Sequence, residues 1–191
     1  MTNASPEWRF AKRLLGFLRH VRWHNPAAMT FKLFISYSTR DLPHVELLRQ
    51  QLEGTSIEIF VAEHSVRPSE ELAPKIGAAI AGCDLFVLLW SENAKASEWV
   101  PQEIGRATAL GKQILPLVLS DTVTLPGFIQ SLKYLPVHKD PAGSFHTARA
   151  MILEEYEKKS AAIAAAAKEK SEKDALALVG IGVFLAWAFG K

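Results

Sequence analysis

An unbroken apolar run constrains the fold of this 191-residue chain more than any other feature. Leu85 through Trp90 are six apolar residues without polar alternation, which predicts a strand over residues 84–90 that is covered on both faces. Strands of this kind belong to parallel sheets flanked by helices. In such sheets the loops at the carboxyl ends of the strands carry the functional groups, so the residues after Trp90 are the first candidates for a site.

The segment after this strand is expected to place a carboxylate beside an aromatic side chain. A polar loop over residues 91–96 leads to a helix that carries Trp99 and Glu103. Residues four positions apart lie on one face of a helix, so these two side chains should be neighbours at the edge of the sheet. Two interpretations remain open from the residues alone. The two form a functional pair, or Trp99 is a core residue and Glu103 a favourable charge in a first helical turn.

Strand and helix patterns alternate from Phe31 to Val137. Gly54 and Gly111 follow two of the expected helices, as glycine commonly does at helix ends. This alternation predicts an α/β fold with a doubly wound, five-stranded parallel sheet. The expected strands are residues 31–36, 57–61, 84–90, 113–119 and 134–137, and the expected helices are residues 42–52, 70–81 and a third that ends at Leu110.

The first 29 residues form a basic extension with five basic side chains and one acidic one. Within it, residues 8–23 fit an amphipathic helix with Trp8 and Trp23 at its ends. A basic amphipathic helix suits an anionic membrane surface. A helix docked on this domain or on a partner fits equally well, and Met29 is an alternative translation start. Charges interrupt every apolar run, so the extension is not a signal peptide.

The carboxyl-terminal part of the chain has a helical composition. Residues 145–177 contain no Gly or Pro, which predicts one long helix, with residues 144–174 forming an Ala/Lys/Glu-rich helix or stalk. Residues 175–190 are sixteen residues without a charge, or about 24 Å of helix. We expect them to form a transmembrane tail anchor with Trp187 at the interface, which predicts a membrane-associated protein with a cytoplasmic domain. The alternative is an apolar helix buried in a homo-oligomer.

Composition excludes several functional classes. The single Cys83 rules out a disulfide within the chain and suits a reducing compartment. The net charge of +2 arises in the extension, so the body lacks the basic surplus of a nucleic-acid binder. The histidines are scattered, and the sequence has neither a metal-ligand cluster nor a Gly-rich phosphate turn, so no metal or cofactor is expected. His64 lies in a polar loop over residues 62–69 and is interpreted as an exposed loop residue.

Four motifs follow one another at a characteristic spacing. They are residues 34–38 (FISYS) with Asp41, the loop over residues 61–69, residues 83–89 (CDLFVLL), and residues 97–103 (SEWVPQE). The last has the pattern W-x-x-x-E. Together the motifs resemble a Toll/interleukin-1 receptor (TIR) domain of the prokaryotic type, over about residues 31–137. The resemblance implies a TIR domain over residues 30–143 with a flavodoxin-like fold.

The resemblance also implies a reaction and a set of site residues. Many prokaryotic TIR domains cleave NAD+ at the nicotinamide–ribose bond, and their catalytic residue is the glutamate of the W-x-x-x-E pattern, here Glu103. NAD+ is then the substrate rather than a cofactor. Expulsion of nicotinamide leaves an oxocarbenium-like ribose, which a carboxylate stabilises. The substrate-binding candidates are Ser36, Tyr37, Ser38 and Trp99, with Arg40 as a phosphate partner by charge.

Three functions are compatible with this resemblance. The first is an NAD+-consuming effector of defence or signalling that is activated when TIR domains self-associate. The second is a non-catalytic adaptor that acts by homotypic TIR–TIR binding, and the third is a secreted TIR protein that blunts host signalling. Glu103 together with Trp99 and Ser36 favours the enzyme. The family often has Gly and an aromatic residue where this chain has Ser69 and Leu72, so this loop departs from the pattern. The sequence leaves open whether the product is ADP-ribose or a cyclic isomer.

Overall fold

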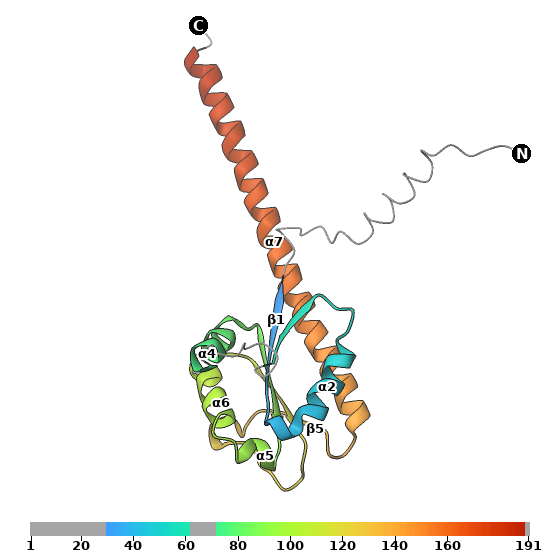
Figure 1. Ribbon diagram of the computed structural model, residues 1–191. Helices are drawn as coiled ribbons and strands as arrows, with labels where there is room; N and C mark the ends of the chain where they lie inside the picture. Colours follow the sequence, from blue (N-terminus) through green and yellow to red (C-terminus); the bar gives the residue numbers. More distant parts are fainter. Residues whose placement is uncertain (1–29, 62–71, 190–191) are drawn as a thin grey trace, which may run out of the picture.

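The computed structural model describes residues 30–61 and 72–189, with the side chains of residues 73–173 in the second range (Figure 1). The predicted amphipathic helix at residues 8–23 lies outside the described residues. So does the predicted loop at residues 62–69, which contains His64 and Ser69.

A five-stranded sheet forms the centre of the molecule, with the strand order β2-β1-β3-β4-β5. Every neighbouring pair of strands is parallel. The predicted doubly wound, flavodoxin-like sheet is therefore confirmed. The strands are β1 (Phe31–Ser36), β2 (Ile57–Phe60), β3 (Leu85–Trp90), β4 (Ile114–Val118) and β5 (Leu135–Pro136), so the last four are shorter than predicted.

The central position of β3 explains its unbroken apolar sequence, because all six of its residues are buried. Side chains alternate between the two faces of a strand. Leu33 and Ile35 of β1 join the core on one face of the sheet, whereas Phe34 joins the core on the other face. There the ring of Phe34 stacks on Phe60 and Phe86 at centroid distances of 5.4 and 5.3 Å. Ser36 has the same parity as Phe34 and so faces the same side.

Helices cover both faces of the sheet (Figure 1). The core on one face includes residues of α2 (Leu42–Gln51) and α7 (Pro141–Phe189), and the core on the other face includes residues of α4 (Leu72–Gly82) and α6 (Val100–Ala109). Short helical turns occupy the connections: η1 (Thr39–Asp41), α5 (Glu92–Lys95) and η2 (Gly127–Ile129). The predicted loop at residues 91–96 thus contains a helical turn, which begins because the Ala94 N–H donates to the Ser91 side chain at 3.0 Å.

Helix α7 is 49 residues long; it begins before the predicted helix at residues 145–177 and continues through the predicted apolar tail to Phe189. Its first part closes the sheet with the buried side chains of Phe145, Ala148 and Ile152. Residues 161–173 are exposed. Within the described part of the chain, no helix is apolar over a sufficient length to cross a membrane. The predicted tail anchor at residues 175–190 is therefore not supported, because its uncharged stretch is shorter than the roughly 20 residues that a bilayer requires.

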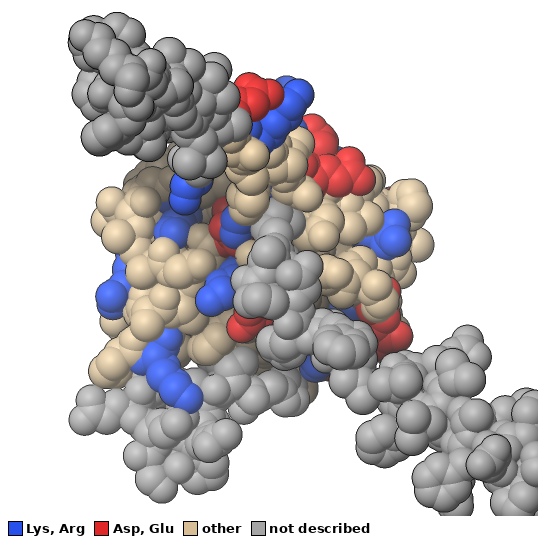
Figure 2. All heavy atoms as spheres, turned by 90° about the horizontal axis from the view of Figure 1, so that it is seen from above, with Lys and Arg blue, Asp and Glu red and all other residues tan. Residues whose placement is uncertain are grey.

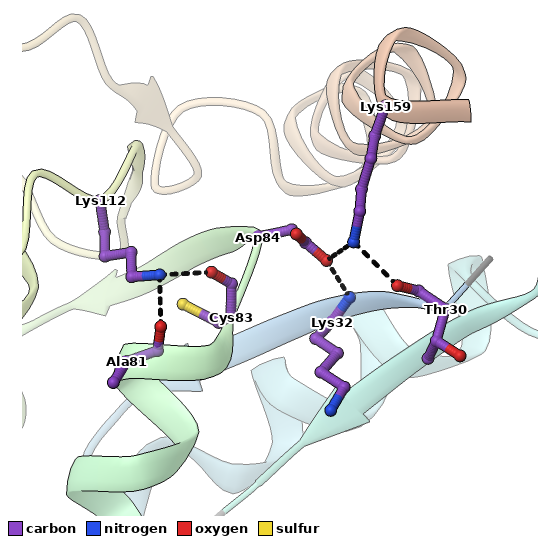
Figure 3. Close-up of polar contacts among 7 residues, drawn as sticks. All are labelled: Thr30, Lys32, Ala81, Cys83, Asp84, Lys112 and Lys159. Atoms are coloured by element: carbon purple, nitrogen blue, oxygen red, sulfur yellow. Dashed lines mark hydrogen bonds and ion pairs between the residues drawn. The ribbon is translucent and has the colours of Figure 1, made fainter. Parts of the chain in front are cut away.

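Lys159 fastens α7 to the amino ends of β1 and β3 (Figure 3). Its Nζ donates to Asp84 Oδ2 at 2.7 Å and to the Thr30 carbonyl at 2.9 Å. Asp84 Oδ2 also accepts the backbone N–H of Lys32 at 2.8 Å, so one carboxylate joins two strands and a helix.

Nearby, Lys112 Nζ donates to two carbonyls at the end of α4, at 2.6 and 2.8 Å. Basic and acidic side chains are interspersed on the face from which α7 extends (Figure 2).

Candidate functional site

A buried hydrogen bond joins β1 to α6 at the carboxyl end of the sheet. Ser36 Oγ donates to Glu103 Oε2 at 2.5 Å, although 67 positions separate the two residues. Ser36 is 1% exposed and Glu103 7% exposed. Each side chain reaches this position for a local reason. Ser36 is the last residue of β1 on the face that α6 covers, and Glu103 lies in the first turn of α6, where Pro101 helps to begin the helix.

The environment of Glu103 favours its protonated form. Burial raises the pKa of this carboxyl group above 4.5, and the Ser36 hydrogen bond opposes part of that rise. The position near the amino terminus of α6 suggests the opposite direction, because a helix dipole favours an anion there. Loss of hydration is the larger effect on the pKa here. A carboxyl group with a raised pKa at the end of a parallel sheet is a common feature of functional sites.

Glu103 lines a pocket of about 310 Å³ between α4 and α6. Trp99 lies on the rim of the pocket and is 44% exposed, so it is not a core residue. The remaining lining is apolar on the α4 side and polar on the α6 side; it consists of Ala73, Ile76, Gly77 and Ile80 from α4, and of Gln102 and Arg106 from α6. The pocket therefore combines a carboxyl group, an exposed indole and a cation.

The structure brings together three of the six predicted site residues, namely Ser36, Trp99 and Glu103. Tyr37 instead packs against the core on the opposite face of the sheet, beside α2 and α7. Ser38 precedes η1, where its carbonyl accepts the Asp41 N–H at 2.7 Å. Arg40 is exposed in η1 and makes no ion pair with a described residue.

A second polar cluster, which the sequence did not single out as functional, joins the ends of β1 and β3. Asp41 is 5% exposed and accepts hydrogen bonds from Ser91 Oγ at 2.5 Å and from Asn93 Nδ2 at 2.9 Å. This cluster holds η1 against α5, beside the point where the strand order reverses between β1 and β3. Ligands of doubly wound sheets bind at such a reversal.

Arg106 and Gln102 were also missed. Both share the helical face of Trp99 and Glu103, so helical spacing from those two residues could have identified them. The described side chains contain no group of three His, Cys, Asp or Glu residues that could hold a metal ion.

These features define a doubly wound, flavodoxin-like α/β domain with a buried carboxyl group at the carboxyl end of its sheet. The sequence profile of the TIR domain matches residues 33–153, which is more than half of the chain. The chain therefore belongs to the TIR domain family.

Solved structures are similar to the chain at low sequence identity. The TIR domain of the Toll-related receptor TRR-2 from Hydra magnipapillata is 22% identical with a TM-score of 0.54, over 65% of this chain and 97% of that one. The CMP N-glycosidase BcmB of Clostridium botulinum is 22% identical with a TM-score of 0.41, over 54% and 86%. The TIR domains of the Roq1 resistosome are 14% identical with a TM-score of 0.45, over 64% and 82%. No curated protein matches the chain.

Proposed function

We propose that this TIR domain cleaves the nicotinamide–ribose bond of NAD+ when its copies self-associate, as an effector of defence or signalling. The observation that carries the proposal is the buried Ser36–Glu103 hydrogen bond at the edge of an open pocket of about 310 Å³. A carboxyl group is costly to bury, and here it is neither in the core nor paired with a described cation. Its position instead suits a cation that forms only during a reaction.

The proposed reaction needs a stabilised cation more than a proton donor. When the bond between ribose C1′ and the pyridinium nitrogen breaks, its electron pair neutralises the ring and nicotinamide leaves uncharged. The positive charge then moves to the ribose as an oxocarbenium ion, and the Glu103 carboxylate stabilises it. Attack by water at C1′, with loss of a proton, gives ADP-ribose. Attack by a nitrogen of the adenine base gives a cyclic isomer.

The neighbouring side chains have supporting roles in this proposal. Ser36 holds one oxygen of Glu103 by its 2.5 Å hydrogen bond, which fixes the direction of the carboxylate. Among the described side chains, Ser36 is the one that hydrogen-bonds Glu103, so the other oxygen, Oε1, remains for a ribose hydroxyl. The exposed indole of Trp99 offers a face on which an aromatic base can stack.

The test is nicotinamide release from NAD+ by the purified full-length chain, at protein concentrations from nanomolar to micromolar. We expect activity per molecule to rise with concentration, because association completes the site. Glu103→Gln should lower turnover by at least about a hundredfold, the loss typical of a missing charge-stabilising group. Its unfolding free energy should change by no more than about 1 kcal/mol, because glutamine keeps an acceptor for Ser36.

The matched control is Glu98→Gln, which removes an exposed carboxylate five residues earlier. It should leave both turnover and stability unchanged. Undiminished turnover in Glu103→Gln would refute the catalytic assignment. If the wild-type chain self-associates but releases no nicotinamide at any concentration, the adaptor function replaces the enzymatic one.

A further inference from the structure

Arg106 lies in an unusual position against the backbone of α4. An ideal Cβ on Gly77 would come within 2.5 Å of Arg106 Cζ and Nη1 and 2.6 Å of Nη2. The guanidinium therefore occupies the space that any side chain at position 77 would fill. The absence of a side chain on Gly77 lets the cation lie at the wall of the pocket that Glu103 lines.

The Arg106 guanidinium has no ion-pair partner among the described residues, and the residue as a whole is exposed. Among the described residues that line the pocket, Glu103 is the only acidic one, and burial raises its pKa. Gln102 adds an amide group to the same helical face, although its Nε2 already donates to the Glu98 carbonyl at 2.7 Å. A planar cation of this kind suits the bidentate binding of phosphate oxygens.

The spacing along α6 fits the order of groups in a dinucleotide. At about 1.5 Å per residue, Arg106 lies about 4.5 Å along the helix axis from Glu103, and Trp99 lies about 6 Å from Glu103 in the other direction. In NAD+, one methylene joins the nicotinamide ribose to the diphosphate. If Glu103 holds the nicotinamide ribose, the adjacent phosphate lies close to Arg106. The nicotinamide base, on the other side of the ribose, then lies toward Trp99.

We propose that Arg106, held over Gly77, is the residue that binds the phosphate next to the nicotinamide ribose. This inference rests on the proposed function. It adds a specificity: the site takes pyridine nucleotides that carry a 5′-phosphate, such as NAD+ and nicotinamide mononucleotide, and takes the phosphate-free nicotinamide riboside poorly.

Binding can be measured without turnover. Titration calorimetry of the full-length chain with ADP-ribose should show that Arg106→Gln weakens binding by about tenfold to a hundredfold, the effect of losing a charged hydrogen-bonding partner. Arg106→Lys should restore only part of the affinity, because an ammonium keeps the charge but lacks the planar fork. The wild-type affinity should fall with added salt more steeply than that of Arg106→Gln. Equal ADP-ribose affinity in wild-type protein and Arg106→Gln would overturn the proposal.

Gly77→Ala provides a second variant, which keeps the arginine at position 106 but displaces its guanidinium. Alanine favours a helix over glycine, and the atoms that it meets are the far end of a flexible side chain, so the protein should stay folded. The displaced guanidinium should weaken ADP-ribose binding in the same direction as Arg106→Gln. The matched control is Gly105→Ala on α6, where an added Cβ meets no atom within 4 Å. It should gain the same helix propensity and bind ADP-ribose as wild type does.

Kinetics separate this inference from the proposed function. Arg106→Gln should raise KM about tenfold or more for NAD+ and for nicotinamide mononucleotide, and should leave turnover of nicotinamide riboside unchanged. If the wild-type chain releases no nicotinamide from NAD+, the proposed function fails, and ADP-ribose titration still decides whether Arg106 binds phosphate. If the wild-type chain is active and KM is unchanged in Arg106→Gln, the proposed function stands and the phosphate subsite is wrong.

Discussion

Glu103 has two properties that normally conflict in one residue, namely burial within the protein and access to a ligand. It is only 7% exposed, which raises its pKa, and yet it contributes to the wall of an open pocket. Ser36 reconciles them, because its hydrogen bond stabilises the charged carboxylate within the protein. The pair should therefore respond to pH both in its stability and in its chemistry.

The sign of the effect on stability follows from the raised pKa. The folded state holds the Glu103 proton more tightly than the unfolded chain, whose pKa is near 4.5. The stability that this proton contributes is complete below pH 4.5 and is lost as pH rises through the folded-state pKa. As pH rises across that window, the melting temperature of Glu103→Gln should therefore increase relative to that of the wild type. A constant difference between the two proteins from pH 4 to 8 would contradict it.

Activity should also depend on the protonation of Glu103, but it should rise with pH where this contribution to stability falls. Because the charged carboxylate stabilises the oxocarbenium ion, kcat/KM should rise as pH passes the folded-state pKa of Glu103. Ser36→Ala removes the hydrogen bond that lowers this pKa, so the acid limb of the profile should move to higher pH. A profile that is unchanged in Ser36→Ala would show that another group controls it.

Trp99 can be tested by separating stability from binding. Truncation of a buried tryptophan typically costs about 3–5 kcal/mol. Since Trp99 is 44% exposed, Trp99→Ala should cost about 1 kcal/mol or less and mainly raise KM for NAD+, by about tenfold if a base stacks on the indole. Trp99→Phe should restore part of the affinity. Phe128→Ala, at an aromatic residue that is 57% exposed on η2, should leave KM unchanged.

At the scale of elements, one charged side chain midway along the described surface of α7 adds to the apolar contacts that hold the helix on the sheet. Lys159 is half-buried, contacts Asp84 and Thr30, and places its ammonium 5.9 Å from the centre of the Phe31 ring. Lys159→Met should lower the unfolding free energy by about 1 kcal/mol, the upper range for a partly exposed ion pair. In a double-mutant cycle with Asp84→Asn, the coupling free energy between the two side chains should account for most of this loss.

The adjacent residue supplies the control. Lys158 pairs with Glu154 and Glu155 on the exposed side of α7, at 2.8 Å in each case. Lys158→Met should leave the chemical unfolding curve at high salt nearly unchanged, because exposed pairs are screened. Equal destabilisation by Lys158→Met and Lys159→Met would mean that helix propensity, rather than the attachment to the sheet, accounts for both.

At the scale of the whole molecule, we expect the end of α7 to contribute little to the stability of the folded domain. Residues 161–173 are exposed. Deletion of residues 175–191 should therefore leave the melting temperature within experimental error of the full chain. If the end of α7 promotes self-association, the truncated protein should be less active when dilute and should recover at high concentration. Full activity of the truncated protein at nanomolar concentration would exclude that role.

Local patterns were sufficient to predict most of the fold. Alternating strand and helix signals predicted five parallel strands, and the unbroken apolar run of β3 predicted its central place, because only a strand covered on both faces can bury every side chain. Strand ends were less predictable, and β5 is two residues rather than four, since the last residues of a strand depend on a partner strand. The predicted anchor is not supported, because no described helix is apolar over a sufficient length to span a membrane.

The composition of the site depended on tertiary structure. The sequence by itself determined which residues end β1 and begin α6, and so nominated Ser36 and Glu103 separately. Only the packing of α6 over β1 decided that Ser36 Oγ reaches Glu103 at 2.5 Å and that Trp99 stays exposed. Arg106 over Gly77 likewise required two helices at contact distance. Sequence periodicity gives the face on which a side chain lies, whereas distances across 67 residues depend on how elements pack.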